Sequence, residues 1–275
     1  MTIKSRNRFF LLFIILTFLL LASYVGGYIA AYLAKNIVPP ENTVRILNIF
    51  PKTLIFGYNF YASIGGILCF VLYAAICSIY VLNGFEKTQS YEVVYFFYFL
   101  ASCLMESIRI ILPLTGIWRN FLPLLEIIGR IVYCARFMAP LTFLFASLFS
   151  ETEFRQIMNR NILTIILLSI FAAMIVPIDT VRLTSTCTLI WGFKLTFVIL
   201  RILIFVATLA SMFINAYQKD NSELKRAAVG YIFIALGYSV LILCDNFVFL
   251  GISIPCLAVG TVVYMQGIHN TYLWR

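Results

Sequence analysis

Long apolar runs separated by short polar stretches dominate this chain. Their lengths and the absence of strict apolar–polar alternation are typical of membrane-spanning helices and argue against β-barrel strands. The predicted spans cover residues 9–34, 54–82, 91–114, 123–149, 161–177, 191–217 and 227–250, followed by a short last span that ends near His269. Gly251 and Pro255 are expected to make the turn before that last span.

The pattern therefore predicts an all-α fold, a polytopic membrane bundle of about eight helices. The expected organisation is an N-terminal transmembrane anchor helix in residues 1–36, an outer loop in 37–53 and a seven-helix bundle in 54–275. The first apolar run is longer than the core of about 7 to 15 residues in a cleavable signal peptide, so we expect it to be retained.

Composition agrees with this interpretation, because 63% of the residues are hydrophobic and only 11% are charged. A soluble domain has about 25% charged residues. The formal net charge of +9 comes from Lys and Arg scattered over loops and helix ends, so the expected partner is the lipid bilayer and no nucleic acid.

The distribution of Lys and Arg predicts the topology. With the N-terminus inside, the inner segments carry ten of these residues and the outer loops carry five. By the positive-inside rule, both termini are expected to be cytoplasmic in a multi-pass protein of a bacterial inner membrane.

Ionisable residues inside the apolar spans are the strongest functional signal. Each costs roughly 2.5 to 3.5 kcal/mol on insertion scales, so it persists only when paired, hydrated or used. The predicted topology places all of them in the outer half of the membrane, on four helices. They are Glu106, Arg109, Glu126, Arg130, Arg136, Lys194, Arg201 and Asp245.

These residues comprise five cations and three carboxylates. The excess of cations favours an anionic ligand, because guanidinium binds carboxylate and phosphate bidentately. The spacing places Glu106 with Arg109, Glu126 with Arg130, and Lys194 with Arg201 on shared helix faces. The alternative interpretation is structural: Glu–Arg pairs neutralise one another and hold the bundle together. Four aromatic residues are candidates for the mouth of such a pocket, namely Tyr58, Tyr61, Trp118 and Trp191.

Catalytic and metal-binding signals are weak. The sequence contains no nucleophile elbow, no His-Glu-x-x-His motif and no Cys-x-x-Cys pair, so no cofactor or metal is expected. Glu106 or Asp245 would suit an acid or base, but no nucleophile accompanies them. Cys187 and Cys256 are both expected near the outer side, where an oxidising environment would allow a disulfide between them.

From about residue 54 onward, the chain resembles the seven-helix N-terminal sensor regions of bacterial signalling proteins fused to histidine kinases or cyclases. The segments that carry the resemblance are 135–140 (ARFMAP), 223–227 (ELKRA) and 245–252 (DNFVFLGI). The resemblance implies a receptor with an outward ligand pocket. An extra helix precedes the seven and no kinase or cyclase follows Arg275, so such a sensor would signal through a separate protein partner.

The expected function is a non-enzymatic sensor that binds a small anionic or amphipathic ligand entering from outside. Arg109, Arg130, Arg136 and Arg201 would hold the anion, and Glu106, Glu126 and Asp245 would orient them. Binding would alter the inner loops 150–160 and 218–226. The competing interpretations are a transporter or permease component and a membrane-embedded lipid-modifying enzyme.

Overall fold

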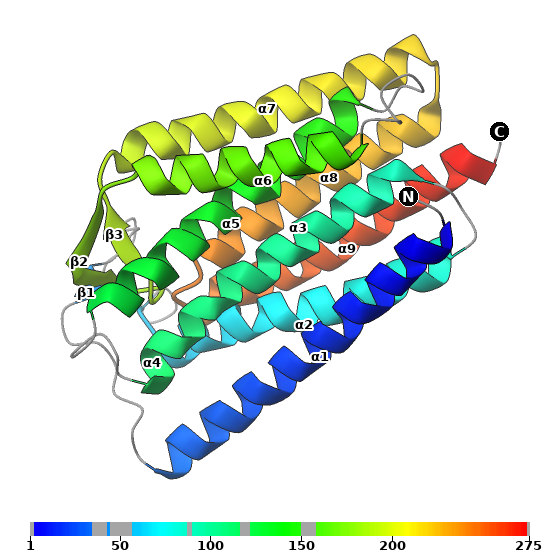
Figure 1. The fold of residues 1–275 in the computed structure, drawn as a ribbon. Helices are drawn as coiled ribbons and strands as arrows, with labels where there is room; N and C mark the ends of the chain where they lie inside the picture. The colour runs from blue at the N-terminus through cyan, green and yellow to red at the C-terminus, as the bar shows by residue number, and fades with distance from the viewer. Residues whose placement is uncertain are drawn as a thin grey trace.

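The computed structural model describes residues 3–34, 43–44, 57–86, 90–115, 122–149 and 158–273, and Figure 1 shows their arrangement. Helices make up most of these ranges. They are α1 (Ile3–Leu33), α2 (Phe60–Phe85), α3 (Tyr91–Ser107), the 3-10 turn η1 (Ile108–Ile110), α4 (Ile111–Thr115), α5 (Leu122–Leu148), α6 (Met158–Ile175), α7 (Lys194–Gln218), α8 (Ser222–Ile242) and α9 (Phe247–Leu273).

Eight helical segments of the described chain are long and apolar enough to cross a membrane, when α3, η1 and α4 are taken as one segment, Tyr91–Thr115. The predicted all-α bundle is therefore confirmed, and the chain has the architecture of a multi-pass membrane protein. Residues 35–42 and 45–56, which contain most of the predicted outer loop, lie outside the described ranges, as do Trp118 and Trp274.

The predicted boundary between the last two spans is wrong. Helix α8 ends at Ile242, and α9 begins at Phe247 and continues for 27 residues through Pro255. The start is fixed by Asn246, whose Oδ1 accepts the N–H of Phe249 at 2.8 Å and so caps α9. Pro255 does not end the helix, because tightly packed neighbours in membrane bundles can compensate for the lost hydrogen bond.

The stretch predicted as a loop after the fifth span forms a small sheet. Strand β2 (Ile178–Thr184) pairs antiparallel with β3 (Leu189–Trp191) and parallel with β1 (Thr43–Val44), in the order β1-β2-β3. Gly129 of α5 permits the hairpin to approach, because a Cβ there would lie 2.7 Å from Leu189 Cδ1. The hairpin thus covers one end of the helical bundle (Figure 1).

The N-terminal end of α1 and the C-terminal end of α9 lie at the opposite end of the bundle from this sheet (Figure 1). We call the two ends the hairpin end and the terminal end. At the terminal end, Arg6 Nη2 donates to Phe85 O at 2.7 Å, which ties the start of α1 to the end of α2. Helix α1 is therefore bound to the bundle at its first turn.

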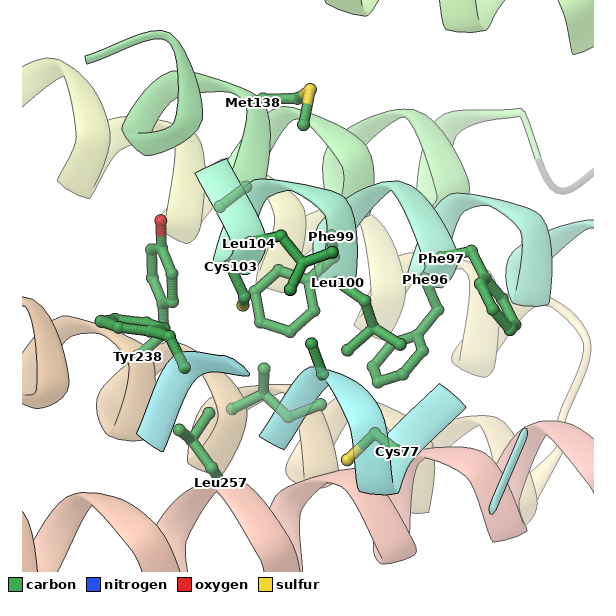
Figure 2. Close-up of a cluster of buried hydrophobic side chains, with 14 of the residues drawn as sticks. Cys77, Phe96, Phe97, Phe99, Leu100, Cys103, Leu104, Met138, Tyr238 and Leu257 are labelled. Carbon is green, nitrogen blue, oxygen red and sulfur yellow. The ribbon is translucent and has the colours of Figure 1, made fainter. Parts of the chain in front are cut away.

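Helix α3 lies at the centre of the core. Figure 2 shows Phe99, Leu100 and Cys103 of this helix directed into the cluster between α3 and α2. The Phe99 ring lies 4.9 Å from that of Phe143 on α5 and 5.5 Å from that of Tyr238 on α8, measured between centroids. This packing fixes the depth of Glu106, two turns further along α3.

Candidate functional site

The ionisable residues form a buried cluster around Glu106. This side chain is fully buried near the end of α3, and its carboxylate accepts hydrogen bonds from Arg136 on α5. The shortest, from Nη2 to Oε1, is 2.7 Å. The second cation, Arg109, lies one turn after Glu106, and its Nη1 is 3.5 Å from the same oxygen. A single carboxylate therefore serves two buried guanidinium groups.

Arg109 links three parts of the hairpin end. Its Nη1 donates to Thr186 O in the hairpin turn at 3.2 Å and to Ile242 O at the end of α8 at 3.4 Å. The guanidinium also lies 5.7 Å from the centroid of the Phe70 ring. Because these contacts hold backbone segments together, the position of Arg109 indicates a structural role.

Arg136 has a different environment, because it also faces a cavity. Its guanidinium carbon lies 5.5 Å from the centroid of the Trp191 ring, in cation–π range. Trp191 stacks on Tyr133 of α5 at 3.8 Å, and the Tyr133 hydroxyl donates to Leu189 O at 2.9 Å. The hairpin thus places its aromatic residue against α5 and over Arg136.

The cavity beside Arg136 has a volume of about 100 Å³ and lies between α5, α7, the end of α8 and the hairpin. We call it the cation pocket. Its polar lining consists of Arg136, Lys194, Arg201, Thr184 and Thr188. Trp191, together with Ile190, Val198, Ile242 and Leu243, supplies the apolar part of the wall. Polar and apolar surfaces meet here as they do in a site for an amphipathic molecule.

Two of the three cations in the cation pocket have no counter-ion among the described residues. Within the described ranges, neither Arg201 nor Lys194 makes an ion pair or a side-chain hydrogen bond. Both are on α7, seven residues apart, and therefore on one face of it. Both line the same pocket, so the predicted shared face is confirmed, and no carboxylate of the described residues neutralises these two charges.

Asp245 lies in the connection between α8 and α9, not late in the seventh span as its position in the predicted helix implied. Its Oδ2 accepts from the Ser185 hydroxyl at 3.2 Å, and its backbone oxygen accepts from Asn59 N at 2.9 Å. The residue anchors the hairpin turn to the starts of α2 and α9, and it does not line the cation pocket.

Glu126 and Arg130 form a separate pair on α5, with Arg130 Nη2 2.6 Å from Glu126 Oε1. This i, i+4 pairing was predicted and is present. Arg130 also donates to Ala173 O and Met174 O at the end of α6, at 3.0 Å each. Its guanidinium thus caps α6. Neither Glu126 nor Arg130 lines the cation pocket. The prediction that all the ionisable residues share one polar site is therefore wrong for this pair.

Thr184 and Thr188 are pocket residues that sequence reasoning missed. Their hydroxyl oxygens are 2.6 Å apart, and the Thr188 backbone N–H donates to Thr184 Oγ1 at 3.1 Å. The available signal is the hydroxyl-rich segment 184–188 (TSTCT), which the span pattern assigns to the loop between the fifth and sixth spans. Of the predicted mouth aromatics, Trp191 lines the cation pocket, Tyr61 is exposed, and Tyr58 is absent from the lining.

The thiols do not add chemistry to this site. All seven cysteines are free, so Cys187 and Cys256 form no disulfide. Cys187 is buried in the hairpin turn, and burial raises the pKa of its thiol to about 11, although Arg109 opposes this effect. Within the described ranges, no group of three His, Cys, Asp or Glu side chains is arranged to hold a metal ion. The arrangement is suited to binding an anion by charge and hydroxyl groups.

No protein-family model matches the sequence, and no curated protein is significantly similar to it.

Proposed function

We propose that this protein is a receptor-like membrane sensor that binds a small amphipathic anion in the cation pocket. The observation that carries the proposal is the guanidinium of Arg201, which lines a cavity next to Arg136 and has no counter-ion among the described residues. Like charges in one partly buried cavity repel each other, and an anion between them would relieve that repulsion.

The chemistry of the wall defines the ligand class. Arg201 and Lys194 would bind a carboxylate or phosphate, and Thr184 and Thr188 would contribute hydroxyl groups. The apolar tail would contact Trp191 and its apolar neighbours. A volume of about 100 Å³ holds an anionic group and the first carbons of its chain, and the rest of a longer chain would leave the cavity past the exposed residue Lys194.

The same geometry suggests how binding would be transmitted. The ligand would bridge Arg136 on α5 and Arg201 on α7, so it would favour one relative position of these helices. Helix α7 ends at Gln218, at the terminal end, where the connection to α8 would move with it. We propose that the terminal end is cytoplasmic and that a separate protein partner detects this movement.

Octanoate is a suitable probe, with octanol as its uncharged counterpart. We expect octanoate, but not octanol, to change the tryptophan fluorescence of the purified protein, because Trp191 lines the pocket. The Lys194→Ala and Arg201→Ala variants should each weaken octanoate binding about tenfold, the effect of losing one charge-assisted hydrogen bond. They are preferable to Arg136→Ala, which would leave Glu106 buried without its closest partner.

Arg226→Ala is the matched control, because Arg226 is exposed, bonds to Gln266 and does not line the cation pocket. Equal binding by the parent and a folded Lys194→Ala, Arg201→Ala double variant would refute the proposal. Sealed vesicles distinguish a sensor from a transporter. We expect radiolabelled octanoate to bind without accumulating, whereas accumulation that requires Arg201 would assign the pocket to transport.

A further inference from the structure

A second and larger cavity lies at the other end of the bundle. Its volume is about 210 Å³, and its lining comes from α3, α5, α7, α8 and α9. We call it the terminal cavity. It is formed where these helices begin or end: Glu92 is the second residue of α3, Lys219 follows α7, and Tyr272 is near the end of α9. Nothing in the cation pocket contributes to it.

Two opposite charges line this cavity without neutralising each other. Glu92 accepts a hydrogen bond from the Tyr272 hydroxyl at 2.7 Å, and within the described ranges its carboxylate forms no ion pair. The Lys219 ammonium has neither an ion pair nor a hydrogen bond to a described residue. A ligand that carries both charges would be complementary to this pair.

Further polar atoms are held in the wall by the fold. Asn215 Nδ2 donates to Ser147 O at 2.7 Å and joins the end of α7 to the end of α5. Met212 and Ile268 provide apolar surface beside them. The cavity could hold about seven waters at roughly 30 Å³ each, which is the size of a small polar headgroup and less than that of a whole lipid.

We propose that the terminal cavity binds a phosphoethanolamine group, with its phosphate at Lys219 and its primary ammonium at Glu92. The ends of membrane-spanning helices lie at the level of lipid headgroups, where a bilayer supplies this zwitterion. A primary ammonium can donate hydrogen bonds to the Glu92 carboxylate, and a trimethylammonium cannot. The site would therefore distinguish ethanolamine from choline. This inference is independent of the anion proposed for the cation pocket.

The test is native mass spectrometry of the full chain after removal of lipid and addition of equal amounts of phosphatidylethanolamine, phosphatidylcholine and phosphatidylglycerol. The parent should retain phosphatidylethanolamine about tenfold more than phosphatidylcholine, as one charge-assisted hydrogen bond predicts. Glu92→Gln should abolish that preference, because the amide still accepts from Tyr272 but has no charge. Lys219→Gln should weaken retention of both zwitterionic lipids.

Glu223→Gln and Lys225→Gln are the matched controls, since both residues lie at the same end and neither lines the terminal cavity. They should leave retention unchanged. Filling the cavity with Ala146→Leu should remove bound lipid and leave the thermal unfolding of the protein cooperative, which separates loss of the site from loss of the fold.

A binding experiment with a soluble headgroup shows whether the phosphoethanolamine group comes from a free compound or from a phospholipid. If glycerophosphoethanolamine binds on its own and displaces the lipid, the free headgroup is the occupant. If it does not bind while the lipid is retained, the occupant is an intact phospholipid. A parent that retains the three lipids equally and binds no soluble headgroup would overturn the proposal, and so would an equal effect of the control substitutions.

Discussion

At the residue scale, the dominant feature is the imbalance of charge around one buried carboxylate. Glu106 compensates Arg136 directly and Arg109 at a longer distance, and Arg201 lies within electrostatic range of both Glu106 and Arg136. The buried cations therefore differ in role: one joins backbone segments, and the other lines a cavity. Arg109 bonds to backbone oxygens of the hairpin turn and of α8, whereas Arg201 faces open space. Only the second arrangement leaves a cation without a counter-ion among the described residues.

This division predicts very different costs for two carboxylate substitutions. Glu106→Ala should lower the free energy of unfolding by about 3 to 5 kcal/mol, because it leaves two buried cations without their counter-ion. Glu126→Ala should cost about 0 to 1 kcal/mol, since Glu126 is 47% exposed. Thermal unfolding in detergent, followed by circular dichroism, measures both. If the two substitutions lowered the free energy of unfolding equally, burial of Glu106 would not explain its contribution to stability.

At the element scale, α8 and α9 make the most extensive contact among the described helices, and glycines allow them to pack closely. A Cβ on Gly267 would lie 2.7 Å from Glu223 O and 2.9 Å from Ala227 N, so a side chain would force the backbones apart. Gly237 meets Leu257 N in the same way, at 2.8 Å. Small residues that permit such an approach are typical of packed membrane helices. This contact also sets one wall of the terminal cavity, which contains Ala227 and Ile268.

Gly267→Ala should therefore destabilise the bundle by about 1 to 3 kcal/mol, as overpacking does in tight cores. Gly251→Ala is the control on the same helix, because a Cβ there meets nothing within 4 Å. That variant should be neutral or stabilising by up to about 1 kcal/mol, from helix propensity alone. The midpoint of thermal unfolding, measured for both variants and the parent, tests this prediction. A Gly267→Ala variant with the same midpoint as the parent would contradict the close packing of α8 and α9.

At the scale of the whole molecule, the bundle has a cavity at each end, and the two differ in charge. The cation pocket at the hairpin end has three cations in its wall, whereas the terminal cavity has one cation and one carboxylate. The eight helical segments long enough to cross a membrane leave the start of α1 and the end of α9 at the same end of the bundle (Figure 1). A ligand at one end and a lipid or partner at the other would act on the same helices, α5, α7 and α8.

The number of spans and the distribution of Lys and Arg give a prediction of orientation. Green fluorescent protein fused to either terminus should fluoresce, because it folds in the cytoplasm, and alkaline phosphatase at the same positions should be inactive. An alkaline phosphatase inserted after Thr186, at the hairpin end, should be active. Opposite behaviour of the N- and C-terminal fusions would contradict an even number of membrane spans.

The sequence alone determined the helical class and the number of helices long and apolar enough to cross a membrane. Apolar runs of about 20 residues have few alternatives to a helix in a membrane, because every backbone polar group needs an internal partner. Local spacing also determined the Glu126–Arg130 pair and the shared face of Lys194 and Arg201, since both depend only on helical periodicity.

Only the tertiary structure decided which charges meet. Glu106 pairs with Arg136, thirty residues away on another helix, whereas Arg130 turns toward the end of α6. Helical periodicity gives the face of a residue on its own helix and not the rotation of that helix against its neighbours. The hairpin that brings Thr184, Thr188 and Trp191 over the cation pocket had no distinctive pattern, because its strands are short and packing against α5 holds them in place.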